Sequence, residues 1–78
     1  MPTLLRKGPY RFHFYSHDSH EPPHVHVERD DCSAKWWLVP VAIARNDGFS
    51  AFELNRLHAV VREHAVEFLE AWDDFFGG

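Results

Sequence analysis

The chain lacks the features that mark several common classes of protein. Its single cysteine, Cys32, excludes an internal disulfide and a zinc site built from cysteines. No apolar run approaches the roughly 20 residues of a membrane-spanning helix, and the N-terminus lacks the long apolar segment of a secretory signal. We therefore expect a cytoplasmic protein that has no membrane partner and folds without disulfides.

Positive charge is also scarce. The formal net charge is −4 with histidine neutral, and it is unevenly spread. Residues 1–45 carry six Lys or Arg against five Asp or Glu, whereas residues 46–78 carry two against seven. This balance disfavours polyanion binding by the whole surface and leaves a local cationic patch on the N-terminal half as an option.

Large aromatic side chains are what the chain has in quantity. Seven Phe, three Trp and two Tyr occur among 78 residues. A chain this short forms one domain, residues 1–78, near the lower size limit for folding by burial alone. Aromatic side chains bury much area for each residue ordered, so we expect a dense core.

The N-terminal half alternates between apolar and polar residues, as β-strands do. Phe12 and Phe14 fall on one side of the segment 10–16, and Arg11, His13 and Tyr15 fall on the other. Similar alternation predicts strands at 24–29 and 33–39, and shorter strands are expected at 3–6 and 41–44. Pro22-Pro23 at the end of a polar loop would lead straight into the strand at 24.

A hairpin is the simplest connection between the strands at 24–29 and 33–39. If Asp30-Asp31 is a two-residue turn, His26 lies opposite Lys35 and His24 lies opposite Trp37. The apolar residues of the two strands then meet on the other face, which is mild support for this pairing.

A long helix is predicted from Ser50 to Phe76. Ser50 and Glu53 fit a capping box, and Gly77-Gly78 ends the run. One apolar stripe follows helical spacing: Leu54, Leu57, Val61, Ala65, Phe68, Leu69, Trp72 and Phe75 or Phe76. Such a helix is long for this domain, so it either breaks near His64 or projects beyond the sheet and leaves its last aromatic residues for a partner.

The predicted fold is α+β, a small antiparallel sheet of three to five strands with one long C-terminal helix packed on one face. The other face would be open. On the predicted register it carries cations, imidazoles and ring faces, the groups that bind RNA. The residues of this candidate binding face are Arg11, His13, Tyr15, His24, His26, Glu28, Lys35 and Trp37.

His24 and His26 are the candidate catalytic residues, because alternation along a strand sends both imidazoles to one face. Two imidazoles act as acid and base on a phosphodiester when their pKa values separate. Lys35 beside His26 would lower the pKa of His26, whereas Glu21 or Glu28 near His24 would favour its protonated form.

Two other interpretations of the histidines stay open. Histidines on the solvent side of a sheet are ordinary and need no function. His-X-His is also a common chelating pair, and His20, Glu21 or Glu28 would complete a metal site. The spacing does not single out a metal and no cofactor is expected; the candidate metal ligands are His20, His24 and His26.

Several segments together carry a family resemblance: 1–6, 10–16, 21–27, 34–38, 48–50 and 69–72. They resemble domain-of-unknown-function family 4160, a family of small bacterial proteins. The resemblance covers essentially the whole chain, and Glu-Pro-Pro-His-Val-His at 21–26 is its most specific part. It implies a stand-alone domain, commonly encoded beside a second small protein in an arrangement that looks like toxin and antitoxin pairs. It supplies no established catalytic residues.

Three functional hypotheses follow. The first is a component of a toxin–antitoxin-type two-gene pair that binds the neighbouring gene's small protein, with RNA as a further ligand, through the histidine-rich face. The second is a metal-independent endoribonuclease that uses His24 and His26, and the third is a His-X-His metal-binding protein. A homodimer through Trp72, Phe75 and Phe76 is a further expectation.

Overall fold

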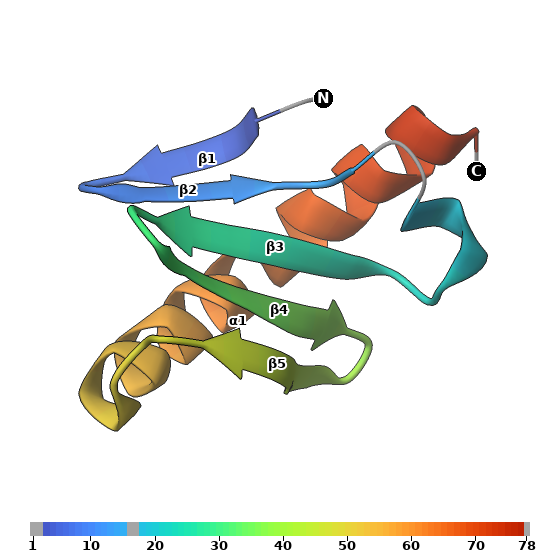
Figure 1. Ribbon diagram of the computed structural model, residues 1–78. Helices are drawn as coiled ribbons and strands as arrows, with labels where there is room; N and C mark the ends of the chain where they lie inside the picture. The colour runs from blue at the N-terminus through green and yellow to red at the C-terminus, as the bar shows by residue number, and fades with distance from the viewer. Residues whose placement is uncertain (1–2, 16–17, 78) are drawn as a thin grey trace.

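A computed structural model describes residues 3–15 and 18–77 and shows an open antiparallel sheet with one long helix across one face (Figure 1). The strands follow one another in the sheet in chain order, β1 to β5. The elements are β1 (Thr3–Lys7), β2 (Tyr10–His13), the 3-10 turn η1 (Asp18–His20), β3 (His24–Arg29), β4 (Cys32–Leu38), β5 (Val41–Asp47) and α1 (Ala51–Phe76). The predicted α+β fold is confirmed. Within the described ranges, no helix is both long and apolar enough to cross a membrane.

The register predicted for the β3–β4 hairpin is confirmed. His26 pairs with Lys35 and His24 pairs with Trp37, in an antiparallel ladder that closes through a turn at Asp30. Asp30 has a φ of 51°, the left-handed conformation that tight two-residue hairpin turns require. A tight turn leaves no freedom of register, so it assigns every side chain of both strands to a face.

Strand β2 is shorter than the alternation at 10–16 predicts, because it ends at His13. The Tyr15 N–H donates to Asp18 Oδ2 at 2.8 Å instead of to a neighbouring strand. The chain therefore leaves the sheet after His13 and turns toward η1. Ser16, the expected last residue of this strand, lies outside the described residues.

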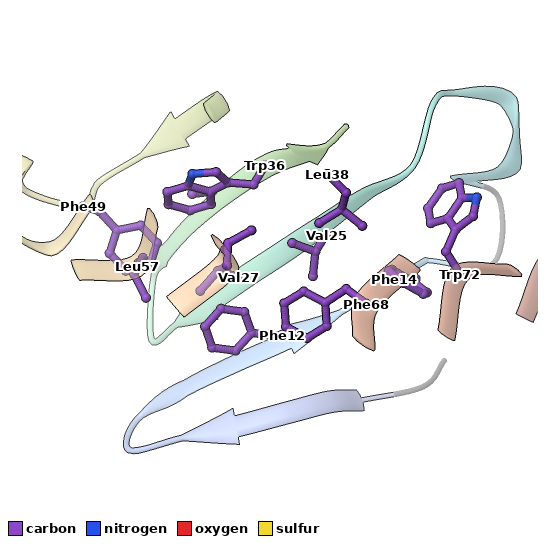
Figure 2. Packing of buried hydrophobic residues seen from close by; sticks show 12 residues of the cluster. Phe12, Phe14, Val25, Val27, Trp36, Leu38, Phe49, Leu57, Phe68 and Trp72 are labelled. Carbon is purple, nitrogen blue, oxygen red and sulfur yellow. The ribbon is translucent and has the colours of Figure 1, made fainter. Parts of the chain in front are cut away.

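The core lies between the sheet and α1, as Figure 2 shows. Phe12, Val25 and Trp36 from the sheet are fully buried, and Val61 from the helix meets the same cluster. The other buried hydrophobic residues are Phe14, Val27, Ala34, Leu38, Phe49, Leu57, Phe68 and Trp72. All the strand members come from the apolar side of the predicted alternation, so the period of two sorts the apolar face correctly.

The N-terminus of α1 is capped by Ser50, whose Oγ accepts from the Glu53 N–H at 3.2 Å. The Glu53 carboxylate does not reach back to Ser50 as a capping box predicts. It accepts from the Tyr10 hydroxyl at 2.8 Å and from Arg29 Nε at 3.0 Å. The Arg29 and Tyr10 donors lower the pKa of Glu53, with the Tyr10 bond as the largest cause. This side chain therefore joins α1 to β2 and β3.

The C-terminal end of α1 excludes one of the two alternatives drawn from its length and agrees with the other only in part. The helix has no break near His64, and its last turns do not leave Trp72 for a partner. Trp72 is only 7% exposed and packs edge-on against Phe14, with ring centroids 5.0 Å apart. Of the three residues expected at a homodimer surface, only Phe75 is exposed, at 42%, and the homodimer itself stays a prediction. The αL residue Gly77 ends the helix; Gly78 lies outside the described residues.

Two valines of α1 provide a matched test of this packing. Val61 is 0% exposed and Val66 is 70% exposed. We expect Val61→Ala to lower the free energy of unfolding by about 2 kcal/mol, because it removes two buried methyl groups and leaves a cavity. Val66→Ala should change it by less than about 0.5 kcal/mol. Urea denaturation followed by circular dichroism measures both, and equal losses would contradict the placement of the helix.

Candidate functional site

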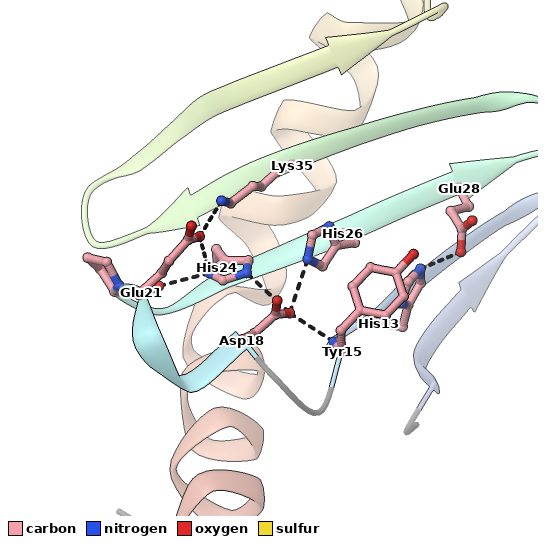
Figure 3. A network of polar contacts seen from close by, with 9 residues as sticks. His13, Tyr15, Asp18, Glu21, His24, His26, Glu28 and Lys35 are labelled. Atoms are coloured by element: carbon pink, nitrogen blue, oxygen red, sulfur yellow. Dashed lines mark hydrogen bonds and ion pairs between the residues drawn. The ribbon is translucent and has the colours of Figure 1, made fainter.

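The sheet face opposite α1 carries the histidines, and Tyr15 and Asp18 from the β2–β3 connection lie beside them (Figure 3). The carboxylate of Asp18, at the start of η1, points toward the imidazoles of His24 and His26 on β3. We call Asp18, His24 and His26 the imidazole cluster. The three offer ligand atoms that lie within 4.8 Å of one another.

Asp18 Oδ2 is the centre of the imidazole cluster. It lies 3.2 Å from His24 Nε2 and 3.1 Å from His26 Nε2, and it accepts the Tyr15 N–H at 2.8 Å. Burial by itself would raise the pKa of this carboxyl, but the Tyr15 hydrogen bond and the two imidazoles outweigh it and hold the pKa below its usual value. Asp18 is therefore an ionised carboxylate in a nearly closed position, with 8% of its surface exposed.

Pro22 fixes the orientation of the His24 ring. The Pro22 carbonyl lies 2.9 Å from His24 Nδ1, and since a carbonyl only accepts, Nδ1 must carry the proton. Proline has no N–H to donate, but its carbonyl still accepts. The carbonyl of the next residue, Pro23, accepts from the Leu38 N–H at 3.1 Å. The Pro-Pro pair thus extends the β3–β4 ladder and orients His24 at the same time.

The expectation that His24 lies on an open face is wrong. Its ring is 0% exposed and lies between Asp18 and two tryptophans. The centroid of Trp37 on β4 is 5.7 Å away and that of Trp72 on α1 is 5.1 Å away. Trp72 reaches His24 because the helix runs past the end of the sheet. The length of the helix, which is what the sequence predicts, gives no indication of this contact.

His26 is 14% exposed and neighbours His24, with ring centroids 5.0 Å apart. Burial lowers the pKa of His26 to about 4, so its imidazole is neutral at pH 7. The predicted direction of this shift is confirmed, but its main cause is burial and not Lys35. The Lys35 ammonium pairs with Glu21 and lies over the Trp37 ring, 4.6 Å from its centroid.

His13 on β2 is also buried, at 0% exposure, so the expectation of an open position is wrong here too. Its Nε2 lies 2.5 Å from Glu28 Oε1, and its ring stacks on His26 with centroids 5.7 Å apart. Burial lowers the pKa of His13 despite the opposing effect of Glu28. Glu28 therefore acts on His13, whereas Glu21 is the carboxylate near His24, at 3.8 Å from Nδ1.

Three further cations of this face are paired with carboxylates. Arg11 lies 3.9 Å from Glu28, and the Arg45 Nε lies 3.3 Å from Asp47. With Lys35 on Glu21, each of these three cations has an acidic neighbour. Arg6, which lies opposite Arg11 in the β1–β2 register, is a further exposed cation of this face.

The candidate metal ligands are only partly brought together. His24 and His26 meet, but the exposed His20 is not among the grouped ligand atoms. The third member of the group is Asp18, which sequence reasoning missed. The sequence does place this acidic residue in the polar loop just before the Pro-Pro pair. It does not show how the loop folds, and so it does not predict that Asp18 meets the histidines. His17, in the same loop, lies outside the described residues.

The fold and this cluster define a small α+β domain whose β2–β3 connection is joined to the sheet through two imidazoles and a carboxylate. A family model described as a domain of unknown function, DUF4160, matches residues 10–73, so the chain belongs to this family. No curated protein and no solved structure matches the chain.

The buried imidazoles make stability depend on pH. The pKa of His26 is about 4 in the fold against 6.5 in an unfolded chain, so between these values only the unfolded state takes up the proton. We expect the free energy of unfolding to fall by about 3 kcal/mol at most as the pH drops from 6.5 to 4, because one pKa unit corresponds to about 1.4 kcal/mol. The lowered pKa of His13 acts in the same direction.

Urea denaturation in the presence of a chelator measures this dependence without interference from metal ions. His26→Gln should flatten the slope between pH 6.5 and pH 4. His64→Gln, at a partly buried position of α1 beside Glu67, should keep it. A wild-type protein whose stability does not change in this window would contradict the burial of the imidazoles.

Proposed function

We propose that this protein is the partner-binding member of a toxin–antitoxin-type two-gene pair in the bacterial cytoplasm, and that it binds the neighbouring gene's small protein along the edge of β5. The gene-pair part of the proposal rests on the family resemblance. The choice of surface rests on β5, because the histidine-rich face is largely closed and three of its cations are paired with carboxylates.

Strand β5 is the single observation that carries the choice of surface. Its only neighbour in the sheet is β4, so its outer N–H and C=O groups have no strand partner in the described part of the chain. The residues 43–47 are all exposed, and Ile43 keeps 45% of its surface accessible. An extended segment of a partner would pair with these backbone groups as a further strand.

A hollow beside β5 supports a protein partner over other ligands. It has a volume of about 230 Å³ and lies between β5 and the first turns of α1, lined by Trp36, Ile43, Ala51, Leu54, Asn55 and His58. The Trp36 indole N–H donates to His58 Nδ1 at 3.1 Å, so the polar atom at its base is already satisfied. The remaining lining is mostly apolar and fits one apolar anchor side chain of the partner strand.

RNA binding and RNA cleavage have less support. A protein gains affinity for RNA when its Lys and Arg side chains neutralise phosphates and release their counterions. Arg11, Lys35 and Arg45 already pair with carboxylates, which weakens this contribution. Acid–base catalysis needs contact with the reacting phosphodiester, and His24 is 0% exposed. No residue of the imidazole cluster lines the hollow beside β5 or a second hollow, which lies between the β1–β2 turn and α1.

Co-expression with the product of the adjacent gene tests the proposal. We expect a complex that survives purification, and we expect Ile43→Lys to weaken it about tenfold or more by placing a charge at an apolar anchor. Val66→Lys is the matched control, since Val66 is equally apolar and 70% exposed on α1. Isothermal titration calorimetry of the folded variants gives the affinities.

Two results would contradict this proposal. If the two proteins do not associate at micromolar concentrations, the partner-binding function is wrong. If Ile43→Lys binds as tightly as Val66→Lys, the partner does not use the β5 edge.

A further inference from the structure

The imidazole cluster contains a buried nitrogen atom whose neighbours do not satisfy it. His24 Nε2 makes no hydrogen bond to any described residue, although it lies 3.2 Å from Asp18 Oδ2. The His24 ring is 0% exposed, so bulk water does not satisfy this atom either. A buried polar atom without a partner is costly, of order 1–3 kcal/mol, and calls for an explanation.

The tautomer of His24 shows what kind of group would satisfy the nitrogen. Because Nδ1 donates to the Pro22 carbonyl, Nε2 of a neutral ring presents a lone pair. The atom that it faces, Asp18 Oδ2, also presents lone pairs and a negative charge. Two such acceptors at 3.2 Å repel each other unless something positive lies between them. That positive group is either a second proton on His24 or a metal ion.

We propose that the imidazole cluster is a binding site for one divalent transition-metal ion of the zinc class, held by Asp18 Oδ2, His24 Nε2 and His26 Nε2. Two imidazole nitrogens and one carboxylate oxygen are donors that suit Zn²⁺, whereas Mg²⁺ and Ca²⁺ prefer oxygen alone. This proposal goes beyond the partner-binding function and does not depend on it.

The spacing of the donor atoms agrees with such an ion. Zinc–nitrogen and zinc–oxygen bonds of about 2.0–2.2 Å in a tetrahedron place the ligand atoms about 3.3–3.5 Å apart. Asp18 Oδ2 lies 3.2 Å from His24 Nε2 and 3.1 Å from His26 Nε2, so only small shifts would be needed. The third separation, between the two imidazole nitrogens, is within 4.8 Å.

The groups around the ligands resemble the supports of a metal site. Metal-bound histidines commonly donate their other ring N–H to a carbonyl or carboxylate, which fixes the tautomer. The Pro22 carbonyl does this for His24, and the Tyr15 N–H orients the Asp18 carboxylate. No fourth His, Cys, Asp or Glu among the described residues joins the group, so a water molecule or a group from a partner would complete the coordination.

A metal ion at this position would join η1 to β3. Asp18 comes from the β2–β3 connection, and both histidines come from one strand. The ion would therefore stabilise the folded chain by an amount that grows with the logarithm of its concentration once this exceeds the dissociation constant. Metal binding would then appear as a shift of the unfolding temperature in the full-length protein, with no activity measurement needed.

Zinc titration of the chelator-treated protein tests the proposal. We expect one Zn²⁺ bound per chain by calorimetry and a rise in the unfolding temperature, with no comparable rise for Mg²⁺. Asp18→Asn should weaken Zn²⁺ binding about tenfold or more, because a neutral amide is a poorer ligand than a carboxylate. His64→Ala is the matched control, since His64 also lies beside a carboxylate, that of Glu67 on α1, outside the imidazole cluster.

Nitrogen-15 NMR of the wild-type imidazoles keeps the proposal testable if Asp18→Asn does not fold. We expect Zn²⁺ to shift the Nε2 resonances of His24 and His26 and to leave the Nδ1–H of His24 in place. A His24 ring with protons on both nitrogens in the presence of excess Zn²⁺ would overturn the proposal, because the proton would then occupy the metal position. Zinc bound with equal affinity by Asp18→Asn would overturn it as well.

Discussion

The covering of the histidine face depends on one oxygen atom, Asp18 Oδ2. It accepts the Tyr15 N–H at 2.8 Å and faces the Nε2 atoms of two histidines at 3.1 and 3.2 Å. A carboxylate that is 8% exposed persists in its ionised form only where hydrogen-bond donors or positive charge face it. Because Tyr15 turns toward Asp18, β2 ends at His13, and Tyr15 and Asp18 lie against the imidazoles of β3 instead of continuing the sheet.

The long helix completes this arrangement from the other side. Its C-terminal turns run past the sheet and place Trp72 against both Phe14 and His24, with ring centroids 5.0 and 5.1 Å away. One aromatic residue therefore packs on the apolar core and on the imidazole cluster together. This contact gives a reason for 26 helical residues in a domain of this size, because a shorter helix would leave His24 without its cover.

The sequence predicts the fold well because local patterns specify it. Alternation and a two-residue turn are sufficient to pair His24 with Trp37, and helical spacing with Ser50 and Gly77 bounds α1. The candidate site is predicted only in part. His24 and His26 share a face as expected, but their burial depends on a polar loop whose path follows from long-range contacts of Asp18. The same limit applies to Glu53, which leaves its expected cap position because Arg29 and Tyr10 lie within reach in the fold. Periodicity contains no information about such contacts.

Hydrogen exchange at the Tyr15 amide tests the central claim most directly, since this N–H donates to the Asp18 carboxylate. If the Asp18 carboxylate joins the β2–β3 connection to β3, the Tyr15 amide should exchange as slowly as the amides of β3, and Asp18→Ala should release it while the β3 amides stay protected. Fast exchange at Tyr15 in the wild-type protein, beside protected β3 amides, would show that the connection does not cover the imidazoles and would contradict the account.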